Sequence, residues 1–192
     1  IGGPSVSPYN PPGLWEELMS RSDGKNWSAQ TYVQSHGDDL YRRTMYTFWK
    51  RTCPPPSLAT FDAPDRETCT VRRARTNTPL QALVMLNDPT YVEASRKMAE
   101  RLLKEGGDDE ESRIALAFRL VASRPPRPRE VAIVREVLAT ERAKFRAAPD
   151  SAAKLLTVGE SPRDATLEPA EVAAWSAVAS MVLNLDEAVT RG

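Results

Sequence analysis

The segment over residues 62–77 holds the side chains with the clearest potential for chemistry. Four arginines and no lysine occur there with three carboxylates, just before a Thr-Pro pair that is typical of a helix start. The planar guanidinium forms bidentate pairs with carboxylate, sulfate or phosphate, which a lysine ammonium does not. The candidate ligand-binding residues are therefore Asp62, Asp65, Arg66, Glu67, Arg72, Arg73, Arg75 and Asn77.

Two interpretations of this segment differ in what the arginines bind. In the first, which we favour, they pair with the neighbouring carboxylates and brace a loop that has few backbone hydrogen bonds of its own. In the second, Arg72, Arg73 or Arg75 joins the free N–H groups after Thr78 in holding a sulfate, carboxylate or phosphate. The first interpretation predicts a structural network, and the second predicts an anion-binding site.

An enzymatic alternative uses the carboxylates of the same segment. Two of Asp62, Asp65 and Glu67 would act on a glycosidic bond, beside a sugar-stacking platform of aromatic side chains. Neighbouring arginines stabilise the charged carboxylate, however, which disfavours the protonated general acid that this reaction needs. Aromatic residues at helical spacing also more often form core, so we favour a noncatalytic interpretation. The aromatic residues in question are Trp15, Trp27, Tyr32, Tyr41, Trp49 and Phe61.

Cys53 and Cys69 flank the proline-rich loop, and two states of this pair remain open. A disulfide would close the loop and add about 3 kcal/mol of stability in an oxidising compartment; otherwise both are small, buried thiols. The single histidine, His36, does not suffice for a histidine-rich metal site. Motifs for haem attachment, dinucleotides and phosphate loops are also absent from the sequence. We therefore expect no metal and no cofactor in this chain.

The charge balance limits the classes of partner. Lys and Arg number 26 and Asp and Glu number 26, so the formal net charge is zero. The chain lacks the overall positive field of a typical nucleic-acid-binding protein, and the arginines of 72–75 support only a minor alternative of that kind. No apolar run approaches the roughly 20 residues that span a bilayer. We expect neither a nucleic-acid partner nor a membrane span.

Helical periodicity dominates the segments between clusters of the 16 prolines. Apolar stripes at spacings of three and four residues predict helices, and a proline after Thr78 and after Asp88 marks two helix starts. No segment of five or more residues alternates polar and apolar side chains convincingly, so we predict an all-α fold of five to seven helices. The expected helices cover residues 38–52, 78–86, 88–103, 110–123, 128–146 and 169–185.

The same pattern predicts one domain. A chain of 192 residues buries a core without a metal or a disulfide framework. We expect a single helical domain over 1–192, with an irregular, extended arm over 1–35 and an ordered Pro/Arg-rich loop over 54–77.

Five motifs extend over nearly the whole chain. They are Pro11-Pro12-Gly13-Leu14-Trp15-Glu16-Glu17-Leu18; Asp39-Leu40-Tyr41-Arg42-Arg43 with Tyr46-Thr47-Phe48-Trp49-Lys50-Arg51; Pro54-Pro55-Pro56-Ser57 with Phe61-Asp62-Ala63-Pro64-Asp65-Arg66-Glu67; Arg75-Thr76-Asn77-Thr78-Pro79-Leu80-Gln81-Ala82-Leu83 with Leu86-Asn87-Asp88-Pro89; and Asn184-Leu185-Asp186-Glu187 after Trp175. Together they resemble the C-terminal part of the planctomycete PSD-type family, a domain of unknown function.

The resemblance implies a setting rather than an activity. Proteins of this kind are large, multidomain and exported, which implies an extracytoplasmic or periplasmic location and makes this chain a C-terminal fragment. It also implies partner domains upstream in the same polypeptide, including a cytochrome-c-like module that would carry haem outside these residues. From the arginine-rich segment and the absence of a catalytic constellation in the sequence, we expect a noncatalytic helical module for packing and for binding an anionic or carbohydrate ligand. The alternative is a part of an enzyme in polysaccharide processing.

Overall fold

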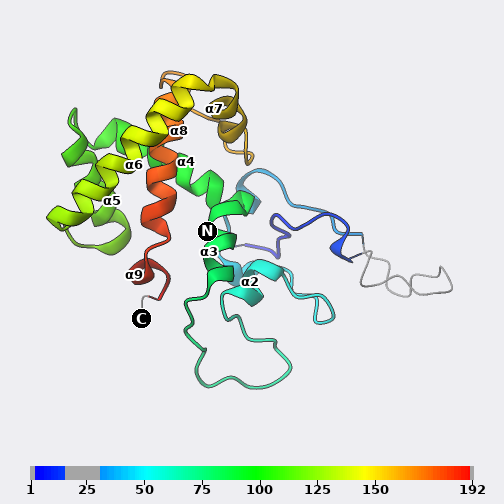
Figure 1. Ribbon diagram of the computed structural model, residues 1–192. Helices are drawn as coiled ribbons and strands as arrows, with labels where there is room; N and C mark the ends of the chain where they lie inside the picture. Colours follow the sequence, from blue (N-terminus) through cyan, green and yellow to red (C-terminus); the bar gives the residue numbers. More distant parts are fainter. Residues whose placement is uncertain (1–2, 16–30, 191–192) are drawn as a thin grey trace. The chain divides into compact units, whose positions relative to one another are not determined.

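The chain divides into two compact units in the computed structural model, which describes residues 3–15 and 31–190. The first unit covers Ile1–Thr76 and the second covers Asn77–Gly192. In Figure 1 the first unit runs from blue to cyan-green and the second from green to red.

The described residues form an all-α fold, which confirms the predicted class. Eight α-helices, α2 to α9, lie within them, and no strand does. The two shortest, α2 and α9, have five and four residues. The elements are η1 (Gly37–Tyr41), η2 (Thr44–Tyr46), α2 (Pro56–Thr60), α3 (Pro79–Asn87), α4 (Pro89–Glu105), α5 (Glu110–Ala122), α6 (Pro128–Ala147), α7 (Pro149–Leu156), α8 (Pro169–Leu183) and α9 (Asp186–Val189).

Thr78 and Asp88, the two predicted capping residues, start α3 and α4 of the second unit. At α3 the Gln81 N–H donates to Thr78 Oγ1 at 3.3 Å, and the Thr78 N–H donates to Gln81 Oε1 at 2.9 Å. The Asp88 and Asp109 carboxylates accept from first-turn N–H groups of α4 and α5. These contacts satisfy N–H groups that a helix leaves free at its first turn, so the starts expected at residues 78 and 88 are confirmed.

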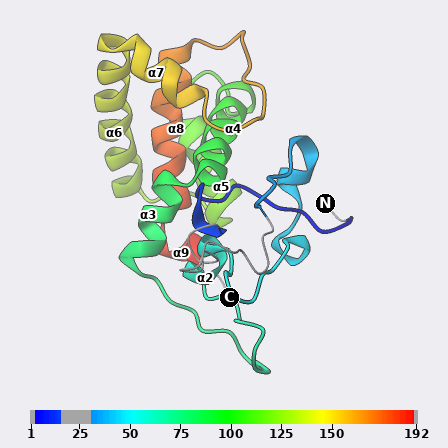
Figure 2. The same cartoon turned by 90° about the vertical axis from the view of Figure 1, so that its right-hand side faces the viewer.

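Helix α8 forms the centre of the second unit. Alanine, valine and other apolar residues cover most of its faces, and Trp175 is fully buried. In Figure 2, α8 runs between α4 and α6, and it also contacts α5 and α7. A helix that is apolar almost all round must be covered on almost all sides, so α8 collects its neighbours around it.

The prediction of a helix over 38–52 is wrong. Two 3-10 helices, η1 and η2, lie in its place, and Met45 and Phe48 are 64% and 41% exposed. The Val6 N–H donates to the Tyr46 carbonyl at 2.9 Å, and the Val6 carbonyl accepts from the Phe48 N–H at 2.8 Å. A helix would need those backbone groups for its own hydrogen bonds. Pairing with a distant segment therefore overrides the apolar periodicity.

The described parts of the expected arm over 1–35 are joined to each other. The Ser7 N–H donates to Ser35 Oγ at 3.0 Å, and the Ser35 N–H donates to the Ser7 carbonyl at 2.7 Å. Residues 16–30 of the arm lie outside the described residues. The short helix α2 falls inside the loop expected over 54–77.

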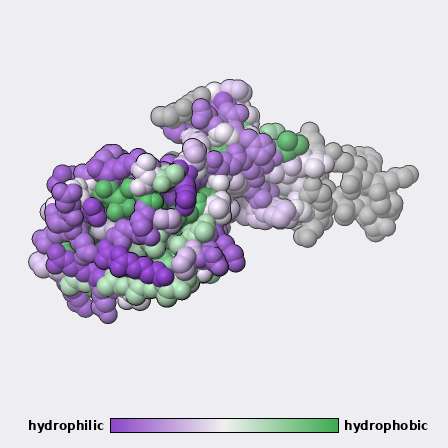
Figure 3. Space-filling model, turned by 90° about the horizontal axis from the view of Figure 1, so that it is seen from above, coloured by the Kyte–Doolittle hydropathy of each residue, from purple (hydrophilic) through white to green (hydrophobic). Residues whose placement is uncertain are grey.

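The surface seen from above in Figure 3 is mostly hydrophilic, with smaller hydrophobic areas between the polar ones. Across residues 3–15 and 31–190, every helix is too short or too polar to cross a membrane. The same residues also contain no group of three or more His, Cys, Asp or Glu placed to hold a metal ion.

Candidate functional site

The three carboxylates of the 62–67 segment make contacts other than those predicted. Asp62 Oδ2 accepts from the Thr76 N–H at 3.0 Å and from Thr76 Oγ1 at 2.8 Å. Asp65 Oδ1 accepts from the Glu67 N–H at 2.9 Å. Glu67 pairs with Arg51, whose Nε lies 2.6 Å from Glu67 Oε1, and this hydrogen bond lowers the pKa of Glu67. The loop is braced by these contacts rather than by its own arginines.

The arginine–carboxylate network that we favoured is not formed by Arg72, Arg73 and Arg75. None of the three has an ion pair or a side-chain hydrogen bond with a described residue, and all lie in a run of exposed residues over 65–77. The reason is local: the carboxylates near them already accept from Thr76, from the backbone or from Arg51.

Arg66 and Arg73 instead line a cavity of about 310 Å³ beside Trp49, which we name the Trp49 pocket. The Arg66 guanidinium lies over the Trp49 ring, 4.8 Å from its centroid. This distance is within the range of a cation–π contact. All lining residues belong to the first unit and are Thr44, Met45, Trp49, Leu58, Ala63, Pro64, Arg66 and Arg73.

The charge and the free donors of the Trp49 pocket suit an anion. Two of its eight lining residues are arginines and none is acidic. The Trp49 indole N–H is buried and has no hydrogen-bond partner among the described residues. Arg66 has a φ of 65°, in the left-handed region that residues other than glycine seldom occupy. An unpaired buried donor and a strained backbone position occur more often at functional sites than elsewhere.

The N-terminus of α3 takes no part in the Trp49 pocket. Its Gln81 N–H is already used in the capping box with Thr78. Asn77 Nδ2 donates to Asp186 Oδ1 at 2.6 Å, within the second unit. Of the predicted ligand-binding residues, the structure therefore brings Arg66 and Arg73 together in one pocket, without Asn77.

The Trp49 pocket does not contain the paired carboxylates that the enzymatic alternative requires. Asp62, Asp65 and Glu67 are all absent from its lining. A hydrolase of the expected kind needs two carboxyl groups facing the bond that breaks. Among the described residues, the lining of the Trp49 pocket offers no such pair.

The aromatic residues of the first unit divide between core and pocket. Trp15 is 7% exposed and packs edge-on against Tyr32, with ring centroids 5.0 Å apart. Trp15 therefore belongs to the core, which was the favoured interpretation, whereas Trp49 lines the pocket. Trp27 lies outside the described residues.

The structure contains no bridge between Cys53 and Cys69. Both are free thiols, with Cys53 buried and Cys69 exposed. Burial raises the pKa of the Cys53 thiol, which makes it less reactive because the thiolate is the nucleophile.

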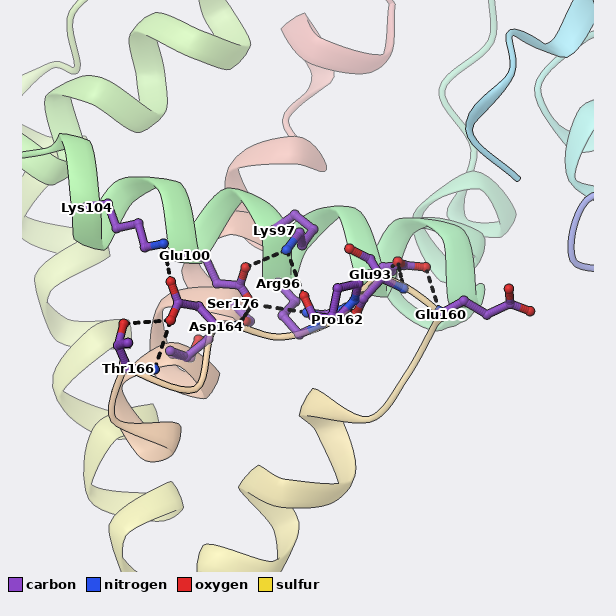
Figure 4. Close-up of polar contacts among 12 residues, drawn as sticks. Glu93, Arg96, Lys97, Glu100, Lys104, Glu160, Pro162, Asp164, Thr166 and Ser176 are labelled. Carbon is purple, nitrogen blue, oxygen red and sulfur yellow. Dashed lines mark hydrogen bonds and ion pairs between the residues drawn. The ribbon is translucent and has the colours of Figure 1, made fainter. Parts of the chain in front are cut away.

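A buried polar cluster on α4 was not predicted from the sequence. Arg96 is 1% exposed, with Nη1 3.0 Å from Glu100 Oε1 and Nη2 2.6 Å from the Ser161 carbonyl. Glu93 is 2% exposed and its Oε1 accepts from the Ser161 N–H at 2.7 Å. Figure 4 shows these side chains on the face of α4 turned toward the loop before α8. The spacing of Glu93, Arg96 and Glu100 on one helix face was the available signal.

The same face of α4 fastens the loop at two further points. Lys97 Nζ donates to the Pro162 carbonyl at 3.0 Å. Lys104 pairs with Asp164, whose N–H donates to Glu100 Oε1 at 3.2 Å (Figure 4). Because its carboxylates accept from loop N–H groups and its cations bind loop carbonyls, the cluster acts as a structural clamp.

Comparison with known proteins identifies a family for this chain but no activity. A family model described as a protein of unknown function (DUF1553) matches residues 1–138, a range that contains every lining residue of the Trp49 pocket. No curated protein and no solved structure matches the chain. The match covers well over half of the 192 residues, and the chain therefore belongs to the PSD1 family of proteins of unknown function.

Proposed function

We propose that the first unit is a noncatalytic binding module, whose Trp49 pocket takes a small anionic ligand such as a uronic or sulfated sugar. Arg66 and Arg73 would contact the anionic group, and the ring of Trp49 would contact the flat or apolar part. The observation that carries this proposal is a cavity of about 310 Å³ lined by two arginines and by no carboxylate.

The state of the two arginines supports the proposal. Arg73 has no ion pair with a described residue, so its charge is not already neutralised by a neighbour. Arg66 is ordered by its contact with the Trp49 ring, which reduces the entropy lost when a ligand binds. A hydrogen bond between a guanidinium and an anion is worth about 1.5–3 kcal/mol, so two of them suffice for measurable affinity.

The test is a titration followed at the tryptophan indole ¹H–¹⁵N resonances of the full chain. The probes are glucuronate and glucose 6-sulfate, with uncharged glucose as the matched control. We expect both anions to shift the Trp49 indole resonance in a saturable way and glucose to leave it in place. The Trp49→Phe variant identifies the resonance.

Substitutions within the same loop provide the control for charge. Arg66→Gln and Arg73→Gln should each weaken binding by about tenfold or more, because each removes a charged hydrogen bond. Arg72→Gln removes the same charge from a neighbouring exposed residue that does not line the pocket, and it should bind as the unmodified chain does. Equal weakening by all three variants, or an unmoved Trp49 resonance with both anions, would contradict the proposal.

The setting outside the cytoplasm and the upstream domains in the same polypeptide are part of this proposal. Their support is the motif resemblance, which extends from residue 11 to residue 187. Fractionation of cells that make the full-length protein tests the location: we expect it outside the cytoplasmic fraction.

A further inference from the structure

We propose that the second unit holds another anion site, in a cavity of about 480 Å³ where α4, α5, α6 and the N-terminus of α8 meet. We name it the α8 cavity. Its ligand class is a small molecule that carries a phosphate or carboxylate on a short apolar body. The site is independent of the Trp49 pocket, because all of its lining residues belong to the second unit.

Three arginines line the α8 cavity, and two of them are not held in a close ion pair with a described residue. Arg113 donates its Nε–H to the Gly107 carbonyl at 2.9 Å and has no ion pair with a described residue. Arg146 has 64% of its side chain exposed, and its Nη2 lies 3.9 Å from the nearest carboxylate oxygen, on Glu171. A contact of that length is at the limit of an ion pair, so both guanidinium groups remain available to a ligand anion.

The third arginine is already engaged and forms a fixed wall. Arg142 Nη2 lies 2.6 Å from Glu171 Oε1, and its Nη1 lies 2.9 Å from Glu110 Oε1. Hydrogen bonds with Glu171 and Glu110 outweigh the effect of burial and raise the pKa of Arg142. Arg142 therefore stays charged and ordered while Arg113 and Arg146 take the ligand.

The two carboxylates that line the α8 cavity are each held in place by hydrogen bonds. Glu168 accepts from the Ala170 and Glu171 N–H groups at 3.0 and 2.7 Å, at the positive end of α8. The Glu171 carboxylate is held by Arg142. The lining holds three arginines and two carboxylates, and Arg113 and Arg146 are the arginines without a close ion pair to a described residue.

The remaining surface of the α8 cavity defines the rest of the ligand. Leu103 of α4 and Leu167, just before α8, supply apolar side chains. A volume of about 480 Å³ is within the range of small-molecule sites, which run from roughly 300 to 1,000 Å³. An anion on a short apolar body matches a cavity with two available guanidinium groups and two leucines better than a bare ion does.

One tryptophan reports directly on this cavity. Trp175 Nε1 donates to Glu171 Oε1 at 3.0 Å, and Glu171 lines the cavity. The chain has four tryptophans, and Trp175 is the only one of them in the second unit. A ligand that binds Arg146 changes the environment of Glu171, the carboxylate nearest to Arg146, and hence of the Trp175 indole N–H.

The experiment titrates phenyl phosphate into the full chain and follows the Trp175 and Trp49 indole resonances together. Phenol and inorganic phosphate are the matched probes that each lack half of the ligand. We expect phenyl phosphate to shift the Trp175 resonance in a saturable way, with an affinity about tenfold above that of inorganic phosphate. Phenol should leave the Trp175 resonance in place.

Variants separate the site from general charge effects. Arg113→Gln and Arg146→Gln should each weaken phenyl phosphate binding at Trp175 by about tenfold. The control is Arg135→Gln, on the same helix as Arg146 but outside the cavity, where Arg135 pairs with Glu111. Equal weakening by Arg135→Gln, or a shift confined to the Trp49 resonance, would overturn the inference and leave the Trp49 pocket proposal intact.

Discussion

The Arg96 guanidinium and the Glu100 carboxylate form a buried ion pair one turn apart on α4. Nη1 lies 3.0 Å from Oε1, with 1% and 8% of the two side chains exposed. On the same helix, Arg101 and Glu105 have the same spacing, but each has about half of its side chain exposed. The two pairs are therefore a matched comparison of the effect of burial.

Removal of Arg96 should destabilise the second unit strongly. Arg96→Met leaves the buried Glu93 carboxylate without its cation and Glu100 with only Lys97, and the loss of one partner of a buried pair costs about 3–5 kcal/mol. Arg101→Met removes the exposed pair and should cost about 1 kcal/mol or less. Urea unfolding followed by circular dichroism measures both. Equal losses in the two variants would show that the clamp on α4 does not depend on burial.

Gly159 approaches the same clamp, and a side chain there should loosen it. Its φ is +85°, and an added Cβ would lie 2.1 Å from Glu93 Oε2. Gly159→Ala therefore combines backbone strain with displacement of a buried carboxylate that binds the Ser161 N–H, at a cost of about 2–4 kcal/mol.

Gly107 is the control for backbone strain alone. Its φ is +79°, and the nearest atom to an added Cβ is at an ordinary contact distance of 3.7 Å, on Ser112. Gly107→Ala should cost about 1 kcal/mol, measured in the same unfolding experiment. A loss for Gly159→Ala no larger than this would mean that Glu93 moves aside freely.

The pair of Arg124 and Glu130 should make stability depend on pH in the acid range. The hydrogen bond from Arg124 lowers the pKa of Glu130 to about 2 in the folded chain. A carboxyl whose folded pKa is lowered adds stability above its unfolded pKa and loses it as the pH falls through the folded value. The contribution should therefore be complete at neutral pH and fade from about pH 4.5 to about pH 2.

The measurement compares Glu130→Gln with the unmodified chain across that range. The difference in unfolding free energy should be present at pH 7 and shrink toward zero at the acid end. Glu136→Gln, on the same helix at a side chain with no ion pair to a described residue, should show no such trend. A difference that stays constant with pH would contradict the assignment to Glu130.

The two thiols should differ in reactivity. Cys69 is exposed and Cys53 is buried with a raised pKa, so a thiol reagent should modify Cys69 quickly and Cys53 only on unfolding. Cys69→Ser should remove the fast phase and leave the slow one. Absence of both phases until a reductant is added would instead reveal the disulfide that the sequence left open.

The helix ends of the second unit were predictable because their causes are local. Thr78 and Asp88 precede prolines. The capping side chain accepts from an N–H group of the first turn, and the proline has no N–H group that needs a partner. Such a helix start therefore does not depend on the rest of the fold. The start of α8 follows the same rule at Pro169. Such signals act between residues three or four positions apart, and these residues are close in space whatever the fold.

The segment over 38–52 shows that contacts between distant residues override these local signals. Its apolar spacing is helical, but Val6 takes the hydrogen-bonding groups of Tyr46 and Phe48. No feature within the segment indicates that a residue some 40 positions away competes for these backbone groups. The same applies to Glu67, whose partner is Arg51 and not an arginine of its own loop.

By itself, the sequence determined the helical class, the positions of five of the eight α-helices in the described residues and the segment in which the arginines gather. Only the tertiary structure decided which of those arginines share a cavity and which carboxylates are already used. The physical reason is that propensity and capping depend on near neighbours. Neutralisation of a charge depends on the distance to the opposite charge in space, and that distance is set when the chain folds.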